Sequence, residues 1–162
     1  MLKVKIELEH PNAKMPIKAS KQAACWDVFA AEINQISIDR YSVNLGFQLE
    51  PPPGFKVVLV PRSSITSTML IQQNSPGQGD EDYRGEYKYI FRMMPESIKY
   101  SGGHINEPYG TRNPRLDYGS FPFNIGDRVG QIYLEKVIDF EFEESILSET
   151  ERGEGGFGST GK

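Results

Sequence analysis

The stretch Leu2-Lys3-Val4-Lys5-Ile6-Glu7-Leu8-Glu9 alternates strictly between apolar and charged residues. Successive side chains of a β-strand point to opposite faces, so a period of two predicts a strand with one buried and one solvated face. The same alternation recurs over 43–49, where every second residue is apolar. We expect one strand there, ended by the prolines and glycine of 51–54.

Compact apolar runs predict further strands at 55–60, 87–91 and 132–137, with a short last strand at 138–142. No window carries a helical apolar stripe longer than about two turns. Short strands separated by glycine and proline turns indicate an all-β sandwich or barrel.

Segment 92–123 differs from the rest of the chain in composition. It combines Gly102-Gly103 and four prolines with five aromatic residues. Turn residues mixed with aromatic side chains favour an ordered excursion with a few strands of its own over a solvated linker.

Composition limits the classes of function. The length of 162 residues suits a single domain. The net charge of −4 argues against a nucleic-acid binder, which would present a basic face. Any polyanionic ligand must therefore be met by a local cationic cluster or a divalent metal. Cys25 is the single cysteine and no long apolar segment is present, so we expect a soluble, cytoplasmic protein without a membrane partner.

Histidine is scarce, because His10 and His104 are the two in the chain. A His-ligated zinc site and a Ser-His-Asp triad are therefore not expected. Catalysis would use carboxylates, an oxygen-bound metal and water as the nucleophile.

The glycine-rich segment 152–162 holds Phe157, two hydroxyls and two cations among five glycines. Glycine lets backbone N–H groups approach an anion, and hydroxyls and cations add contacts that phosphate prefers. A lone Phe is free to stack on a base. The alternative is a flexible Gly/Ser tail. The G-x-x-x-x-G-K pattern of 156–162 is followed in this sequence by neither Ser/Thr nor a helix, so a P-loop fold is not expected.

Four further clusters could carry chemistry, and each also has an ordinary structural interpretation. The acidic turn 80–86 could simply be solvated, and 61–64 and 126–131 could be polar turns, the latter with a surface Asp127–Arg128 pair. Asp27 lies in an apolar strand, where a carboxylate without a partner is costly. We therefore expect Asp27 to be hydrogen-bonded or linked to a metal.

Taken in order, these clusters resemble the five motifs of the homotrimeric deoxyuridine triphosphatases (dUTPases). The similar segments are 24–30, 61–64, 77–86, 126–131 and 152–161. Three positions depart from the family pattern. Cys25 stands where glycine is usual, Gln78-Gly79 stand where two apolar residues are usual, and Gly130 stands where alanine is common. We expect a looser base-binding hairpin from the second departure and little consequence from the third.

The resemblance implies a jelly-roll β domain over 1–151, with 92–123 as an insertion and 152–162 as a lid. It implies a homotrimer with active sites at subunit interfaces, each drawing on all three chains. The implied reaction is dUTP plus water giving dUMP and pyrophosphate, with Mg²⁺ as cofactor.

The resemblance also implies a role for each matched residue. Asp80 resembles the general base, Tyr83 the residue packed under the deoxyribose, and Asn74 the amide that reads uracil. Asp27 would bind a water on Mg²⁺. The residues implied in phosphate binding are Arg62, Ser63, Ser64 and Gln131. Those implied to close over the nucleotide are Arg152, Phe157, Gly158, Ser159 and Thr160, with Phe157 on the uracil.

Two alternatives stay open at this stage. One is a dCTP deaminase-like enzyme of the same fold, although that family lacks the Asp-x-Asp-Tyr-Arg-Gly pattern of 80–85 in this setting. The other is a regulator that binds a partner protein through the insertion, as some virus-encoded members of the family do. A virus-encoded protein of this kind would lie in the host cytoplasm.

Overall fold

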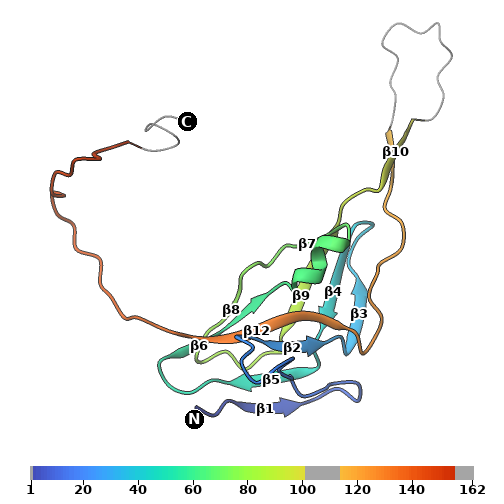
Figure 1. Ribbon diagram of the computed structural model, residues 1–162, viewed down its shortest axis with the longest axis horizontal. Helices are drawn as coiled ribbons and strands as arrows, with labels where there is room; N and C mark the ends of the chain where they lie inside the picture. Colours follow the sequence, from blue (N-terminus) through green and yellow to red (C-terminus); the bar gives the residue numbers. More distant parts are fainter. Residues whose placement is uncertain (1, 101–113, 156–162) are drawn as a thin grey trace, which may run out of the picture.

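The computed structural model describes residues 2–100 and 114–155, and its body is a sandwich of two four-stranded antiparallel sheets (Figure 1). In spatial order, one sheet consists of β2 (Trp26–Phe29), β12 (Arg128–Lys136), β6 (Phe55–Val60) and β8 (Gly77–Gly79). The other consists of β3 (Glu32–Gln35), β4 (Arg40–Asn44), β9 (Lys88–Met93) and β7 (Leu70–Gln72).

Two smaller antiparallel pairs complete the described structure. They are β1 (Lys5–Leu8) with β5 (Phe47–Glu50), and β10 (Ser97–Tyr100) with β11 (Pro114–Asp117). A 3₁₀ helix, η1 (Ser63–Ser67), follows β6. The predicted all-β class is confirmed. In the described part of the chain, no helix has the length and apolarity needed to cross a membrane.

The strand predicted over 43–49 was wrong in one respect, because it forms two strands. The chain bends after β4 at Gly46, whose φ of +69° favours glycine, and continues as β5. The bend carries the chain from the β4–β9 pair to the β1–β5 pair. Leu45 and Phe47 are both fully buried, so the apolar alternation continues through the bend.

Aromatic side chains of β9 fill the core between the two sheets. Tyr89, Phe91 and Met93 alternate inward along the strand, and the rings of Tyr89 and Phe91 stack at 5.8 Å. Val28 of β2 and Val129 of β12 meet them from the facing sheet. This arrangement follows from the period of two in both strands.

The segment after β9 leaves the body as the β10–β11 hairpin and returns along the core (Figure 1). On the return, Phe121 stacks on Tyr41 at a centroid distance of 4.1 Å and contacts Phe91. Phe123 contacts Phe91 as well. The base of this excursion is therefore continuous with the hydrophobic core.

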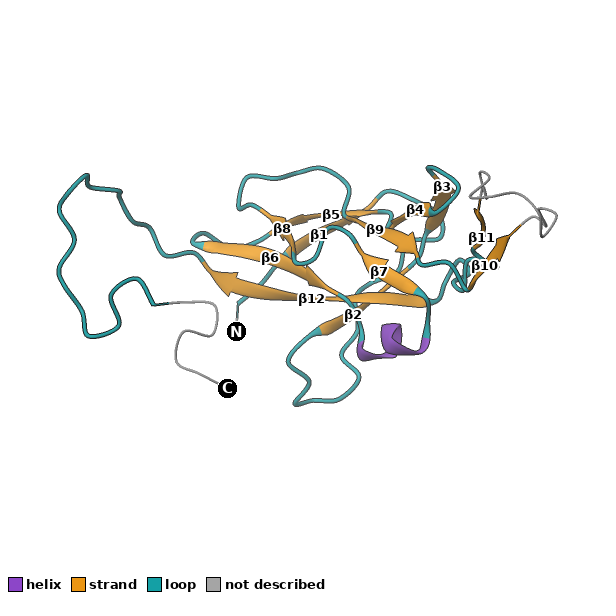
Figure 2. Cartoon of the chain, turned by 90° about the horizontal axis from the view of Figure 1, so that it is seen from above, coloured by secondary structure: helices purple, strands orange, loops and turns teal. Residues whose placement is uncertain are grey.

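Residues 137–155 form an extended arm that leaves the body at the end of β12. Figures 1 and 2 show the arm and the β10–β11 hairpin at opposite ends of the body. The prediction of a strand at 138–142 was wrong for the single chain, because this segment pairs with no described strand. Ile138 and Phe142 are 78% and 94% exposed. An apolar segment needs a neighbouring strand before its alternation can become a sheet.

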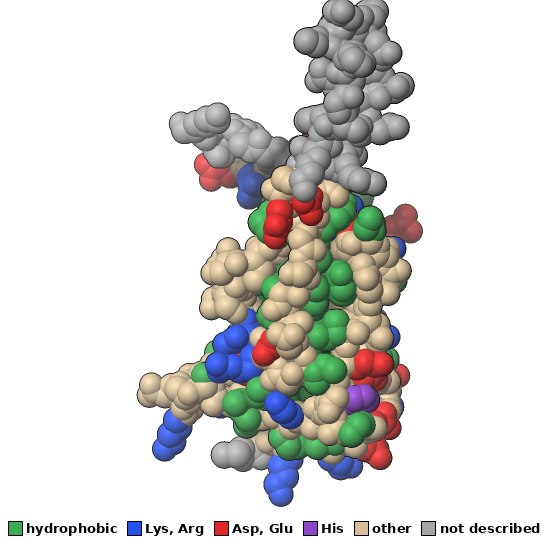
Figure 3. Space-filling model, turned by 90° about the vertical axis from the view of Figure 1, so that its right-hand side faces the viewer, with side chains coloured by type: hydrophobic (Ala, Val, Ile, Leu, Met, Phe, Trp, Pro, Cys, Tyr) green, Lys and Arg blue, Asp and Glu red, His purple; other side chains and the backbone are tan. Residues whose placement is uncertain are grey.

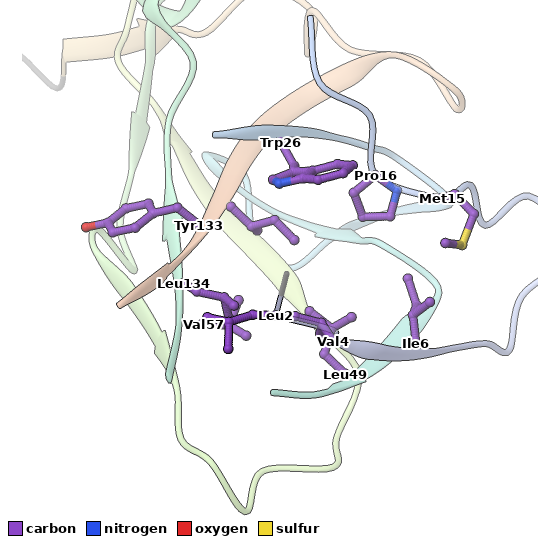
Figure 4. A pocket seen from close by; sticks show the side chains of 11 residues that line it. Leu2, Val4, Ile6, Met15, Pro16, Trp26, Leu49, Val57, Tyr133 and Leu134 are labelled. Atoms are coloured by element: carbon purple, nitrogen blue, oxygen red, sulfur yellow. The ribbon is translucent and has the colours of Figure 1, made fainter. Parts of the chain in front are cut away.

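The face of β1 that was predicted to be buried lines an open apolar groove. Val4 and Ile6 lie there beside Trp26 of β2 and Leu134 of β12, around a volume of about 290 Å³ (Figure 4). On the side of the molecule seen in Figure 3, apolar side chains reach the surface as a stripe bordered by charged side chains of both signs.

Candidate functional site

Asp27 is the centre of a buried polar cluster. Its side chain is 1% exposed, and both of its carboxylate oxygens are hydrogen-bonded. Oδ1 accepts hydrogen bonds from Nε of Arg62 at 3.2 Å and from Nε2 of Gln131 at 2.9 Å. Oδ2 accepts a bond from Nη1 of Arg128 at 3.1 Å. The expectation that Asp27 is hydrogen-bonded is confirmed.

Strand register brings these residues together. Asp27 of β2 lies opposite Gln131 of β12, and Gln131 lies opposite Val60 at the end of β6. Arg62 follows Val60 by two residues, so its side chain reaches the same place. A bulge at Val129 shifts the β2–β12 register beside Arg128.

The electrostatics of this cluster favour an ionised Asp27. Burial alone would raise the pKa of its carboxyl, but the hydrogen bond from Gln131 and the charges of Arg62 and Arg128 outweigh burial, and the pKa lies below its ordinary value. Two guanidinium cations against one carboxylate leave a net charge of +1. Because the Arg128 side chain is 46% exposed, this charge is available to an anion.

The hydroxyls predicted beside Arg62 open the helix η1. Ser63 and Ser64 are both exposed, and Oγ of Ser64 accepts a hydrogen bond from Nη1 of Arg62 at 3.4 Å. Arg62, Ser64 and Gln131 thus belong to one side-chain network with Asp27, and Ser63 lies at its edge.

Asp80 follows β8 directly and lies in a turn. Its backbone oxygen accepts the N–H of Tyr83 at 3.1 Å, while its carboxylate is exposed and accepts no hydrogen bond within the described residues. Glu81 anchors the turn to the end of the β5–β6 connection, because its Oε2 accepts the N–H of Gly54 at 2.7 Å. Arg84 closes the turn by donating to the Glu81 oxygen at 2.6 Å.

Tyr83 lies half exposed above this turn. Its hydroxyl donates to the backbone oxygen of Glu86 at 3.1 Å, and its ring end lies over Gly85, where a Cβ would overlap it. Glu86 in turn accepts bonds from Asn44 at 2.8 Å and from the N–H of Gly46 at 3.0 Å. The aromatic face of Tyr83 is therefore held in place by backbone contacts at its far end.

Asn74 ties the segment before β8 to β9. Its Nδ2 donates to the oxygen of Lys88 at 3.0 Å, and its Oδ1 accepts the N–H of Ile90 at 2.9 Å. One amide hydrogen and one oxygen lone pair remain for other contacts.

The two glycine departures have packing reasons. A Cβ added at Gly79 would lie 2.6 Å from Cε1 of Tyr87, and one at Gly130 would lie 2.5 Å from Cε1 of Tyr89. The expectation that Gly130 matters little was wrong, because Tyr89 occupies the space that an alanine would need. At Gly79 the missing side chain leaves no gap, because the ring of Tyr87 fills that space.

The cluster around Asp27 and the turn at Asp80 lie at opposite ends of β6. Gly79 pairs with Val57 near the start of β6, whereas Gln131 pairs with Val60 and Arg62 lies beyond the end. Six residues of extended chain separate the position opposite Asp80 from Arg62, which is about 20 Å at roughly 3.3 Å per residue. A single chain therefore does not bring these predicted site residues together.

The glycine-rich segment is described in part. Nε of Arg152 donates to the oxygen of Gly155 at 2.7 Å, in an exposed turn at the tip of the arm. Phe157, Gly158, Ser159 and Thr160 lie outside the described residues.

The predicted Mg²⁺ role of Asp27 is limited by its hydrogen bonds. Among residues 2–100 and 114–155, no three His, Cys, Asp or Glu side chains are grouped to hold a metal. Asp27 accepts three bonds, which leaves one of its roughly four lone-pair positions. The remaining position can accept a hydrogen bond from one metal-bound water.

No protein-family model matches the chain. The deoxyuridine 5'-triphosphate nucleotidohydrolase of Helicobacter pylori strain P12 is 32% identical over 165 residues, covering 99% of this chain and 97% of that protein. The protein of strain HPAG1 matches to the same extent. The chain belongs to the dUTPase family.

Solved dUTPase structures share the fold of this dUTPase family member. The dUTPase of Staphylococcus bacteriophage 80alpha with dUPNHPP aligns with a TM-score of 0.76 and 24% identity, covering 99% of both chains. A mutant dUTPase of phage phi11, described with a structural Mg(II) ion, aligns with a TM-score of 0.68 and 22% identity over 91% of this chain. The predicted fold and family are confirmed.

Sequence reasoning missed two residues. Arg128 was given no role beyond a surface pair with Asp127 in the ordinary interpretation of 126–131, yet it bonds Asp27, while Asp127 accepts the N–H of Asn124 at 2.7 Å. The cost of burying Asp27 was a signal that a second cation was needed. Tyr87 was assigned to a strand alone, and no sequence pattern indicated its contact with Gly79.

Proposed function

We propose that this chain hydrolyses dUTP to dUMP and pyrophosphate at a composite site, with the Asp80 turn from one chain and the Asp27 cluster from another. Family membership supports the reaction. The observation that carries the residue assignment is the Asp80 carboxylate, which is exposed and unbonded within the described residues while its backbone is fixed by Tyr83. A carboxylate in that state is free to accept a proton from water.

In the proposed reaction, Asp80 is the general base. Asp80 accepts a proton as the water oxygen bonds to phosphorus, and the bond between the α- and β-phosphates breaks to release pyrophosphate. Tyr83 packs under the deoxyribose and leaves no room for a 2′-hydroxyl. Asn74 holds the hairpin that reads uracil, with its remaining amide hydrogen directed to the base.

The phosphates are assigned to the cationic cluster. Arg62 and Arg128 supply charge, and Ser63, Ser64 and Gln131 supply neutral contacts. Mg²⁺ bound to the triphosphate would neutralise its charge, with Asp27 holding one of the metal's waters. Arg152, Phe157, Gly158, Ser159 and Thr160 close over the nucleotide, with Phe157 stacked on the uracil.

Two observations support a homotrimer. The roughly 20 Å along β6 between the two halves of the site supports completion of the site by a second chain. The arm after β12 also displays apolar side chains that a neighbouring copy would cover. Ile146 is 98% exposed and Leu147 is 87% exposed. Such contiguous exposure is typical of an interface.

The test is pyrophosphate release from dUTP compared with dCTP, dTTP and UTP, with and without Mg²⁺. We expect release from dUTP alone, dependent on the metal. Ammonia release from dCTP would favour the deaminase alternative, and no turnover of any nucleotide would contradict the proposal. Mixing an Asp80→Asn chain with an Arg62→Ala chain tests the composite site. Mixed trimers regain activity only if the two residues act across an interface.

A regulatory role is the second candidate. The 80alpha dUTPases are described as controlling transfer of virulence genes by a G protein-like mechanism. The β10–β11 hairpin of this chain projects away from the body, where a protein partner could reach it (Figure 1). Replacing 97–117 with a short Gly/Ser link should preserve dUTP hydrolysis. Loss of hydrolysis would show that the segment serves the enzyme itself.

A further inference from the structure

Tyr87 supports β8 from inside the sandwich. It directly precedes β9, is 3% exposed, and ends beneath Gly79, where a Cβ would overlap its hydroxyl oxygen. Gly79 is followed by Asp80. The ring of Tyr87 therefore contacts the backbone next to Asp80. The length of the Tyr87 side chain sets the position of that backbone.

The same ring contacts Tyr83. The two centroids are 5.4 Å apart at an interplanar angle of 76°, an edge-to-face pair. On its other side Tyr87 packs on Phe47, at 6.3 Å and 30°. Tyr83 is thus held between the ring of Tyr87 and its hydrogen bond to the Glu86 oxygen.

The hydroxyl of Tyr87 has no hydrogen-bond partner within the described residues. Hydrogen bonding therefore does not hold the side chain in this position. Burial raises the pKa of Tyr87 to about 12, and the nearby Tyr83 adds to the effect, so the phenol is neutral. An unpaired buried hydroxyl is unfavourable. The ring is therefore present for its shape, filling the space that Gly79 leaves.

We propose that Tyr87 is a positioning residue that fixes the spacing between the Asp80 turn and Tyr83, and so sets the preference for deoxyribose over ribose. This inference rests on the roles proposed for Asp80 and Tyr83. Removing the ring would let both move independently, and a misplacement near 1 Å can cost about 100-fold in rate.

The experiment compares kcat/KM for dUTP and for UTP in five variants, one of which is Gly79→Ala alone. Tyr87→Leu removes the ring, and Tyr87→Phe keeps it. Tyr41→Leu is the matched control, because it removes an aromatic ring that stacks on Phe121 away from β8. Gly79→Ala combined with Tyr87→Leu restores part of the lost volume from the other side of the contact.

We expect Tyr87→Leu to lower the dUTP/UTP preference by about tenfold, with Tyr87→Phe and Tyr41→Leu within about threefold of wild type. The double variant should be more active than Gly79→Ala alone, because the overlap is relieved. If Tyr87→Leu does not fold, the comparison of the double variant with Gly79→Ala tests the inference. An unchanged preference in Tyr87→Leu, or additive losses in the double variant, would overturn the inference. A wild-type protein without preference for dUTP would instead refute the role of Tyr83.

Discussion

The ring of Tyr89 on β9 occupies the space that a side chain at Gly130 on β12 would need, and its hydroxyl donates to the backbone oxygen of Gln131 at 2.7 Å. This contact joins the two sheets beside the Asp27 cluster, because Gln131 also bonds Asp27. Tyr87, two residues earlier, packs against Gly79 in the same way but without a hydrogen bond from its hydroxyl. Two tyrosines of one segment therefore pack against glycines of the facing sheet. Tyr87 does so beside the Asp80 turn, and Tyr89 does so beside the Asp27 cluster.

Gly130→Ala should destabilise the protein. The added methyl would lie 2.5 Å from Cε1 of the fully buried Tyr89, so one strand must shift. Overpacking of this kind typically costs about 1–3 kcal/mol. Urea unfolding measures the loss, and adding Tyr89→Leu to the same chain should recover part of it. An unfolding midpoint equal to wild type would contradict the packing described for Gly130.

Tyr89→Phe and Tyr87→Phe should have different effects, although both side chains are buried. The Tyr89 hydroxyl donates to the backbone oxygen of Gln131 at 2.7 Å, whereas that of Tyr87 has no partner within the described residues. Losing a made hydrogen bond costs about 0.5–1.5 kcal/mol, and removing an unpaired hydroxyl costs little or stabilises. Thermal unfolding of the two variants side by side is the measurement, and equal losses would contradict the prediction.

Asp27 should contribute stability that depends on pH. Burial works against its charge, but Gln131, Arg62 and Arg128 lower its pKa below the ordinary 3.8. A carboxyl with a depressed pKa in the folded state stabilises above its unfolded pKa, and this contribution is lost as the pH falls through the folded value. Asp27→Asn should therefore cost about 1–3 kcal/mol near pH 7.

The pH dependence of the unfolding free energy separates the contribution of the Asp27 charge from that of its packing. The difference in unfolding free energy between wild type and Asp27→Asn should shrink as the pH falls below 3.8. Urea unfolding at several pH values gives that difference directly. If it stayed constant down to the acid limit of folding, the ionised carboxylate would not be its source.

Asp80→Asn should remove turnover while leaving nucleotide binding nearly intact. The exposed Asp80 side chain makes no described hydrogen bond, so its replacement disturbs little structure. Loss of a positioned base costs about 10²–10⁴-fold in kcat. Steady-state kinetics and titration of a non-hydrolysable dUTP analogue separate the two effects. Activity within a few-fold of wild type would remove Asp80 as the base.

Deleting 152–162 should weaken catalysis severely and leave the assembly unchanged. Arg152 and Gly155 form an exposed turn at the end of the arm, with no described bond to the body. Closure over the nucleotide would expel water and add phosphate contacts. Light scattering reports the assembly and pyrophosphate release the activity. A truncated chain with full activity would exclude a lid function for this segment.

Much of the local structure could be predicted from the sequence. Period-two alternation predicted the buried face of β5 and a compact apolar run predicted β9, because both patterns are properties of neighbouring residues. The roles of Asp80 and Tyr83 were assigned through the resemblance to the dUTPase motifs, and they stay predictions. The roles of Phe157 to Thr160, the insertion boundaries and the cytoplasmic location stay predictions.

Only the tertiary structure decided which residues meet across long sequence separations. Asp27 bonds Arg128, 101 residues away, because β2 and β12 are adjacent in one sheet. Glycine at 79 and 130 is explained by Tyr87 and Tyr89 in the opposite sheet. Alternation determines which face a side chain takes, but the partner on that face depends on strand order and register. Those follow from packing the whole chain, and no local pattern encodes them.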